Sequence, residues 1–116
     1  MKQTPEGAVK TLVHKLLLSY GVFPAKDAPR FTLACKGWYY MPVQNGMGVT
    51  GIPDFVGHVK GRFFVVETKS LGKKPTQLQK HQLDAISISG GVAFVIDGEE
   101  SLKELKKWLD SLFVRL

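Results

Sequence analysis

The sequence is poor in cysteine and in long apolar runs. Cys35 is the single cysteine among 116 residues, which excludes an intrachain disulfide and a thiol-rich metal cluster. We expect its side chain to be a small buried hydrophobe rather than a reactive thiol. No apolar run approaches the roughly 20 residues that cross a bilayer, and the first ten residues carry no apolar signal core. We therefore expect a cytoplasmic protein without a membrane span.

Repeats, low-complexity tracts and linkers are also lacking, so we expect one domain over residues 1–116. Apolar residues make up 44% of the chain and charged residues 22%, which is typical of a globular protein and excludes a fibre or a disordered chain. The 16 lysines and arginines outnumber the 10 aspartates and glutamates, giving a net charge of +6. Residues 1–81 hold 12 of these basic residues but four acids: Glu6, Asp27, Asp54 and Glu67. Such a region suits a polyanion-binding surface.

Apolar periodicity predicts three helices and four strands. Spacings of three and four residues indicate helices at 5–20 and through 102–112, and Thr76 with Gln79 forms a capping-box pattern that opens a helix ending near Gly90. The expected strands are 31–35, 55–59, 62–67 and 92–96. The run Phe63 to Val66 suggests a strand covered on both faces. A strand, a helix and a strand in succession imply a right-handed crossover, so the fold class is α/β with a mixed sheet flanked by helices, in the order α-β-β-β-α-β-α.

Asp54, Glu67 and Lys69 are the residues most suggestive of chemistry. Lys60-Gly61 is typical of a two-residue hairpin turn, and counting outward from it pairs residue 54 with residue 67. Cross-strand neighbours lie about 4.5–5.5 Å apart at Cβ, and residues two apart on a strand share a face. Two carboxylates and an ammonium therefore converge. They form either a structural salt bridge at a strand end or a site where a hard divalent cation relieves the repulsion of two carboxylates.

The order of several short motifs resembles a known nuclease family. Pro53-Asp54 followed by Glu67-Thr68-Lys69 looks like the PD-(D/E)XK nuclease signature. The fuller pattern resembles the virus-type replication-repair nuclease (VRR-NUC) domain. Its features here are Glu6 on the first helix, Gly51-Ile52-Pro53-Asp54, Glu67-Thr68-Lys69, Thr76 with Gln79, and Gly90-Gly91 before Val92. The match runs from about residue 4 to residue 97.

The resemblance implies a PD-(D/E)XK-like fold with its active site at one edge of the sheet. It also implies an endonuclease that hydrolyses DNA phosphodiester bonds with Mg²⁺ or Mn²⁺. Asp54 and Glu67 then correspond to metal ligands, together with the backbone carbonyl of Thr68, and Lys69 corresponds to the catalytic lysine.

Two further residues have both a family role and an ordinary one. The resemblance places Glu6 close to the metal or its water, whereas its position in a first helical turn is also favoured by the helix dipole. Gln79 corresponds to a glutamine that positions the water or holds Lys69, although it is equally suited to capping its own helix.

Free-standing members of the family act as homodimers on branched DNA such as four-way (Holliday) junctions, and the resemblance points to a phage or a mobile element. Two alternatives remain open: a non-catalytic nucleic-acid-binding module on the same fold, and a restriction-type endonuclease that reads a specific sequence. A short chain leaves little room for a recognition region, and phosphate contacts carry no sequence information. We therefore expect recognition of DNA shape.

Three other groups of residues suggest surfaces for partners. The basic residues suited to phosphate contacts, or else to plain solvation, are Lys60, Arg62, Lys73, Lys74 and Lys80. The aromatic run Trp38-Tyr39-Tyr40 would stack on unpaired bases or pack in the core or a dimer interface. The last helix ends in apolar residues that we expect to contribute to a dimer: Trp108, Leu109, Leu112, Phe113, Val114 and Leu116.

Overall fold

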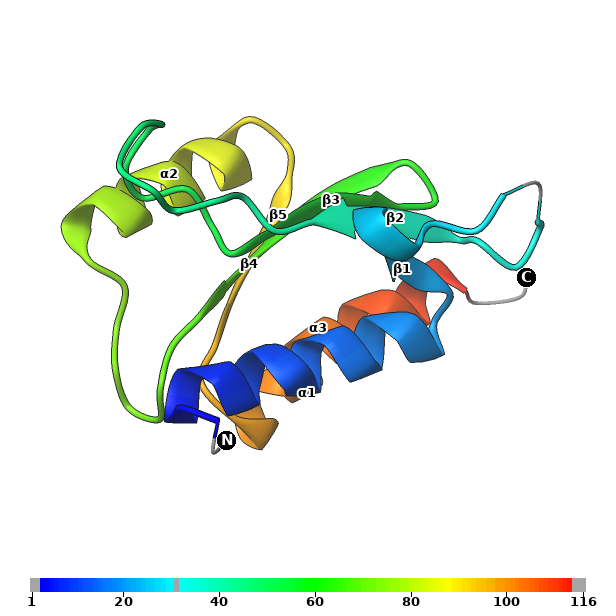
Figure 1. Ribbon diagram of the computed structural model, residues 1–116, viewed down its shortest axis with the longest axis horizontal. Helices are drawn as coiled ribbons and strands as arrows, with labels where there is room; N and C mark the ends of the chain where they lie inside the picture. The colour runs from blue at the N-terminus through cyan, green and yellow to red at the C-terminus, as the bar shows by residue number, and fades with distance from the viewer. Residues whose placement is uncertain (1–2, 31, 114–116) are drawn as a thin grey trace.

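The computed structural model describes residues 3–30 and 32–113. A five-stranded mixed sheet, in the order β1-β2-β3-β4-β5, has α1 and α3 side by side on one face and α2 on the other (Figure 1). The elements are α1 (Pro5–Ser19), β1 (Val22–Pro24), the 3-10 turn η1 (Ala25–Asp27), β2 (Gly37–Tyr40), β3 (Phe55–Val59), β4 (Arg62–Thr68), α2 (Gln77–Ile88), β5 (Val92–Ile96) and α3 (Glu99–Leu112). The predicted α/β class and mixed sheet are confirmed.

The prediction missed one strand and misplaced another. The observed order is α-β-β-β-β-α-β-α, because β1 pairs in parallel with β2. The strand expected at 31–35 is wrong over 32–35, and Phe31 lies outside the described residues. The Thr32 hydroxyl accepts a hydrogen bond from the Ala34 N–H (3.2 Å), and the Thr32 carbonyl accepts one from the Cys35 N–H (3.4 Å). This local bonding makes a turn where apolar alternation predicted a strand. Cys35 is half-buried rather than buried.

The β3–β4 hairpin has the predicted register. Phe55 lies opposite Val66, and Val59 lies opposite Arg62. The connecting residues Lys60 (φ 51°) and Gly61 (φ 83°) both adopt left-handed backbone, as a type I′ turn requires. The turn thereby fixes which residues meet at the other end of the hairpin.

The hydrophobic core lies between the sheet and the helices α1 and α3. Its buried residues are Val9, Val13 and Leu17 of α1; Val22, Tyr39, Phe55, Val59, Phe64, Val66, Phe94 and Ile96 of the sheet; and Leu105 and Leu109 of α3. Trp108, Leu112 and Phe113 pack against this core. They are only partly buried there, so a role of this helix in a dimer stays a prediction, and Val114 and Leu116 lie outside the described residues.

The opposite face of the sheet is only partly covered. Phe64, Val65 and Val66 are fully buried, as predicted for a covered strand, but Phe63 is 45% exposed.

Over residues 3–30 and 32–113, no helix is both long enough and apolar enough to cross a bilayer.

Candidate functional site

Two carboxylates meet at the open end of the β3–β4 hairpin. Asp54 immediately precedes β3, and Glu67 is the penultimate residue of β4. Continuing the observed register by one pair sets them opposite each other, as the sequence predicted. Glu67 is only 2% exposed, and the Asp54 side chain is 13% exposed. Two acids in so dry a position require compensation.

Glu67 has an oxygen without a partner. Its buried Oε2 makes no hydrogen bond within the described part of the chain. The pKa of Glu67 is raised to about 8, first by burial and then by the nearby Asp54 carboxylate, and the Lys69 ammonium offsets only part of this shift. At neutral pH this carboxyl therefore retains a proton unless a cation binds beside it.

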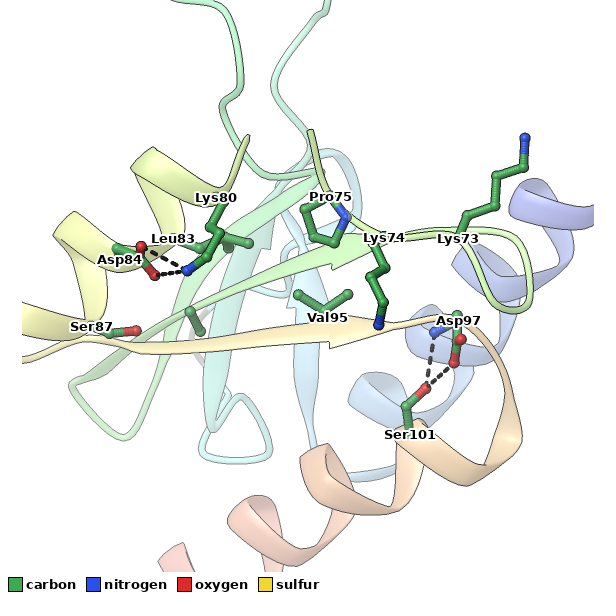
Figure 2. Close-up of a pocket in the computed structure, with 11 residues that line it drawn as sticks. Lys73, Lys74, Pro75, Lys80, Leu83, Asp84, Ser87, Val95, Asp97 and Ser101 are labelled. Atoms are coloured by element: carbon green, nitrogen blue, oxygen red, sulfur yellow. Dashed lines mark hydrogen bonds and ion pairs between the residues drawn. The ribbon is translucent and has the colours of Figure 1, made fainter. Parts of the chain in front are cut away.

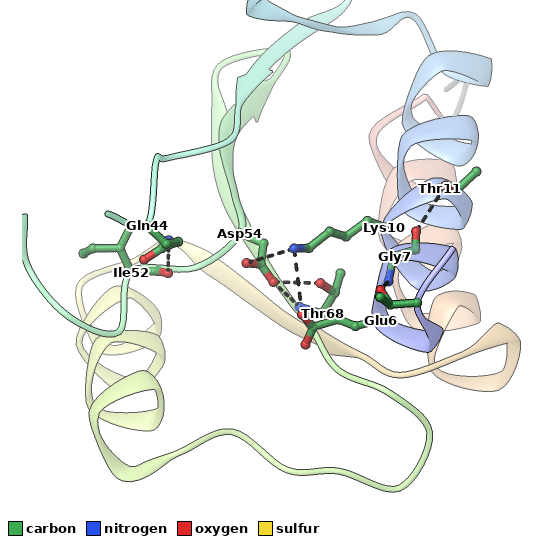
Figure 3. A network of polar contacts seen from close by, with 9 residues as sticks. Glu6, Gly7, Lys10, Thr11, Gln44, Ile52, Asp54 and Thr68 are labelled. Carbon is green, nitrogen blue, oxygen red and sulfur yellow. Dashed lines mark hydrogen bonds and ion pairs between the residues drawn. The ribbon is translucent and has the colours of Figure 1, made fainter. Parts of the chain in front are cut away.

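Thr68 fixes the orientation of Asp54. The Thr68 backbone N–H and hydroxyl both donate to Asp54 Oδ2, at 2.9 and 2.7 Å. Asp54 Oδ1 makes neither of these bonds and lies 3.9 Å from Lys10 Nζ (Figure 3). Only the carbonyl of Thr68 was predicted to contribute to the site, whereas the structure adds a positioning role for its fully buried side chain. No pattern in the sequence indicated this bond.

Lys10 is a site residue that was not predicted from the sequence. Its ammonium lies between two carboxylates, 3.8 Å from Glu6 Oε2 and 3.9 Å from Asp54 Oδ1. The four-residue spacing from Glu6 is visible in the sequence as a helical pair. The contact with Asp54 was not predictable from that spacing, because it depends on how α1 docks beside the hairpin. The Glu6 charge also adds to the raised pKa of Glu67.

The predicted site residues line one hollow. Glu6, Asp54, Glu67, Lys69 and Gln79 all border a space of about 470 Å³. The structure thus brings together residues from α1, the hairpin, the segment after β4 and α2. Among its other lining residues is Gln44, which the sequence analysis did not single out; its side-chain amide donates to the Ile52 carbonyl at 3.1 Å (Figure 3).

The loop before Asp54 packs against the start of α2. Gly51 has φ +92°, and a Cβ there would lie 2.6 Å from the Leu78 carbonyl oxygen. At the start of α2 itself, Gln79 Oε1 accepts from the Thr76 N–H at 2.9 Å, and Thr76 Oγ1 accepts from the Gln79 N–H at 3.2 Å. The capping box is therefore confirmed. A role of Gln79 toward water or Lys69 stays a prediction.

The carboxylate pair is suited to a hard cation that takes only one or two of its ligands from protein side chains. Within residues 3–30 and 32–113, no three or more His, Cys, Asp or Glu side chains gather in a metal-binding group. Mg²⁺ commonly takes one or two carboxylates and completes its shell with water and phosphate oxygens. The partnerless Oε2 of Glu67 beside Asp54 fits that requirement.

Lys60 and Arg62 lie far from this site. Lys60 is a residue of the hairpin turn and Arg62 directly follows the turn, one strand length from the site, which is about 17 Å for five residues. Lys60 Nζ donates to the Leu112 carbonyl at 3.0 Å and lies 4.9 Å from the centroid of the Phe113 ring. Lys60 therefore ties the hairpin turn to the end of α3.

The other predicted basic residues border a second hollow, of about 600 Å³, beside α2 and β5 (Figure 2). These residues are Lys73, Lys74 and Lys80. Lys80 Nζ pairs with Asp84 at 2.9 Å, and Figure 2 shows Lys74 extending toward Asp97. This hollow therefore carries charges of both signs.

Comparison with known proteins adds no family to this description. No protein-family model, curated protein or solved structure matches the chain. The fold is a mixed α/β sheet with three helices, and a functional conclusion rests on the site itself.

Proposed function

We propose that this protein is a Mg²⁺- or Mn²⁺-dependent endonuclease of the PD-(D/E)XK type that hydrolyses phosphodiester bonds in branched DNA. The observation that carries the proposal is the buried, partnerless Oε2 of Glu67 beside Asp54, in a hollow that Lys69 also lines. We place this activity in the cytoplasm and assign it to a homodimer, whose two sites would cut two strands of a four-way junction.

Asp54 and Glu67 would hold the ion, with the Thr68 carbonyl as a further oxygen ligand. When bound, the ion neutralises negative charge that develops on the attacked phosphate. The Thr68 N–H and hydroxyl keep Asp54 in one orientation, so little rearrangement is needed on binding. Cation binding would also replace the proton that Glu67 otherwise retains.

Lys69 would act on the nucleophilic water or on the phosphate. An ammonium beside Glu67 can orient that water, accept its proton when neutral, or balance phosphate charge. Glu6 and Gln79 border the same hollow and would position the water. The lysines of the second hollow, Lys74 and Lys80, would contact the DNA backbone and so support recognition of shape.

One observation favours a second candidate, a non-catalytic nucleic-acid-binding module. Lys10 Nζ already lies within 4 Å of carboxylate oxygens of Glu6 and Asp54. A protein that compensates part of its acidic charge with its own lysine has less need of a metal ion. The two candidates differ in one measurable property, which is turnover.

The deciding experiment incubates the purified full chain with a synthetic four-way junction, a flapped duplex or a linear duplex, with Mg²⁺, Mn²⁺ or EDTA. We expect cleavage of the junction with either metal, none in EDTA, and loss of cleavage in Asp54→Asn and Lys69→Met with junction binding retained. Lys103→Met is the matched control, because Lys103 is an exposed lysine of α3. Binding without turnover on any substrate would replace the nuclease with the binding module, and defined fragments from linear DNA would indicate a restriction-type enzyme.

A further inference from the structure

We propose that unpaired nucleobases bind on the face of β2 and β3 opposite α1 and α3, with Trp38 and Tyr40 as stacking surfaces. This inference rests on the proposed function in one respect, since it names the part of a branched substrate that lies beside the cut. From the sequence, the aromatic run Trp38-Tyr39-Tyr40 is suited either to base stacking or to packing. The structure divides the run, because Tyr39 is 1% exposed in the core whereas its two neighbours point to the opposite face.

Strand pairing places these aromatics in register with the carboxylates. Trp38, His58 and Phe63 lie opposite one another and form one row across the sheet. The next row contains Tyr40, Val56 and Val65. Two residues further along the hairpin, the same register reaches Asp54 and Glu67.

The two aromatic rows share one face of the sheet, because side chains two residues apart on a strand point the same way, whereas Asp54 lies just beyond the paired residues and contacts Thr68 and Lys10 of α1. Successive rows are about 7 Å apart, so the Trp38 row lies on the order of 14 Å from the carboxylates.

The aromatic side chains of these rows are exposed, although Val65 in the second row is fully buried. Trp38 is 37% exposed, Tyr40 43% and Phe63 45%. The Trp38 and Tyr40 rings are neighbours, with centroids 5.7 Å apart and planes inclined by 39°. Figure 1 shows α2 beside β4 and β5, and no α-helix among the described elements lies over β2 and β3 on this side. Exposed aromatic faces are the surfaces on which single-stranded bases stack without sequence preference.

The site's geometry favours nucleobases over a second copy of the chain as the occupant. The two aromatic rows contain no acidic residue, so a polyanion meets no repulsion until it reaches the carboxylates. The exposed members of the rows are four side chains, Trp38, Tyr40, His58 and Phe63, whereas a stable protein interface uses roughly 20–30 residues on each side. The carboxylates, on the order of 14 Å away along the strands, then favour a ligand that is bound near its scissile phosphate.

The test uses tryptophan fluorescence, because the chain has two tryptophans and they lie in different surroundings. Trp108 packs between Phe64 and Phe94, with ring centroids 5.6 Å from each, whereas Trp38 is exposed. Oligothymidylate is titrated into the full chain in EDTA, which prevents cleavage. We expect the emission of Trp38 to be quenched, and the quenching to be absent in Trp38→Phe. An abasic oligonucleotide of equal length, which keeps the phosphates but has no bases, should not quench.

Affinity variants separate stacking from folding. Trp38→Leu and Tyr40→Leu should each weaken oligothymidylate binding roughly tenfold, Trp38→Phe should restore most of the affinity, and Leu33→Ala, an exposed apolar control in the loop before β2, should change nothing. Equal quenching by the abasic strand overturns the inference. Quenching that instead follows protein concentration, with a rise in mass, would assign the face to a second copy and would also overturn it.

The experiments distinguish a failure of this inference from a failure of the proposed nuclease function. If the double variant Trp38→Leu/Tyr40→Leu binds and cuts junctions like the parent chain, this inference fails while the nuclease stands. If no metal supports cleavage but oligothymidylate quenches Trp38, the nuclease fails while this inference stands.

Discussion

At the scale of single residues, Glu67 sets a pH dependence of stability. Its folded pKa is raised to about 8 from an ordinary 4.5, so folding favours the protonated form. This contribution to the free energy of unfolding is therefore complete below pH 4.5 and is lost as pH rises toward about 8. In EDTA, urea unfolding should show this slope in the parent chain and not in Glu67→Gln. A slope that persists in Glu67→Gln would assign the dependence to another group.

The same carboxyl gives a test of metal binding that needs no activity. At a pH above 8, Mn²⁺ should stabilise the parent chain by about 2.7 kcal/mol when its concentration is a hundred times the dissociation constant. Glu67→Gln should show little of this stabilisation, whereas Glu104→Gln, which alters an exposed acid of α3, should retain it.

Lys10 is expected to weaken metal binding, whereas Glu67 is expected to support it. Its ammonium lies 3.9 Å from Asp54 Oδ1 and repels an incoming cation. Lys10→Met should therefore tighten Mn²⁺ binding roughly tenfold at low salt, with a smaller effect at high salt because the Lys10 side chain is 35% exposed. Calorimetric titration would measure it, with Lys15→Met, an exposed lysine of the same helix, as control. Weaker binding in Lys10→Met would instead make Lys10 an organiser of the site.

At the scale of elements, the loop that carries Asp54 depends on one glycine. Gly51 combines φ +92° with a Cβ position 2.6 Å from the Leu78 carbonyl oxygen. Gly51→Ala should destabilise the fold by about 1–3 kcal/mol and weaken Mn²⁺ binding, because the loop must move away from α2. Gly46→Ala is the matched control, since Gly46 also has positive φ (+79°) but nothing within 4 Å. Thermal unfolding and Mn²⁺ titration of both variants would check this, and equal losses would contradict it.

Two elements with short local signatures were predictable, whereas the strand β1 and the turn from Thr32 to Cys35 were not. The hairpin turn and the capping box each depend on two to four adjacent residues, and both are present as predicted. The three-residue β1 owes its strand conformation to pairing with β2, which no local pattern indicates. In the site, the Asp54–Glu67 juxtaposition followed from counting along one hairpin. The approach of Lys10 required knowledge of how α1 docks.

At the scale of the whole molecule, the net charge of +6 predicts strongly salt-dependent DNA binding. The logarithm of the junction affinity should fall linearly with the logarithm of salt concentration. Lys74→Met should reduce the magnitude of that slope by about 1, because Lys74 borders the hollow beside α2. Lys60→Met should leave the slope unchanged, because that ammonium binds the Leu112 carbonyl instead. Fluorescence anisotropy at several salt concentrations would measure both slopes, and a change in the Lys60 variant would place DNA at the hairpin turn.

The hairpin's tight turn also bears on the order of assembly during folding. Its two acids are joined by the closure of one short loop, which costs little chain entropy and closes fast, whereas the Lys10 ammonium reaches Asp54 only when α1 docks against the sheet. The two acids therefore repel each other before the Lys10 ammonium is close enough to reduce that repulsion. Refolding should accelerate in mildly acidic solution, where a proton substitutes for the late-arriving lysine.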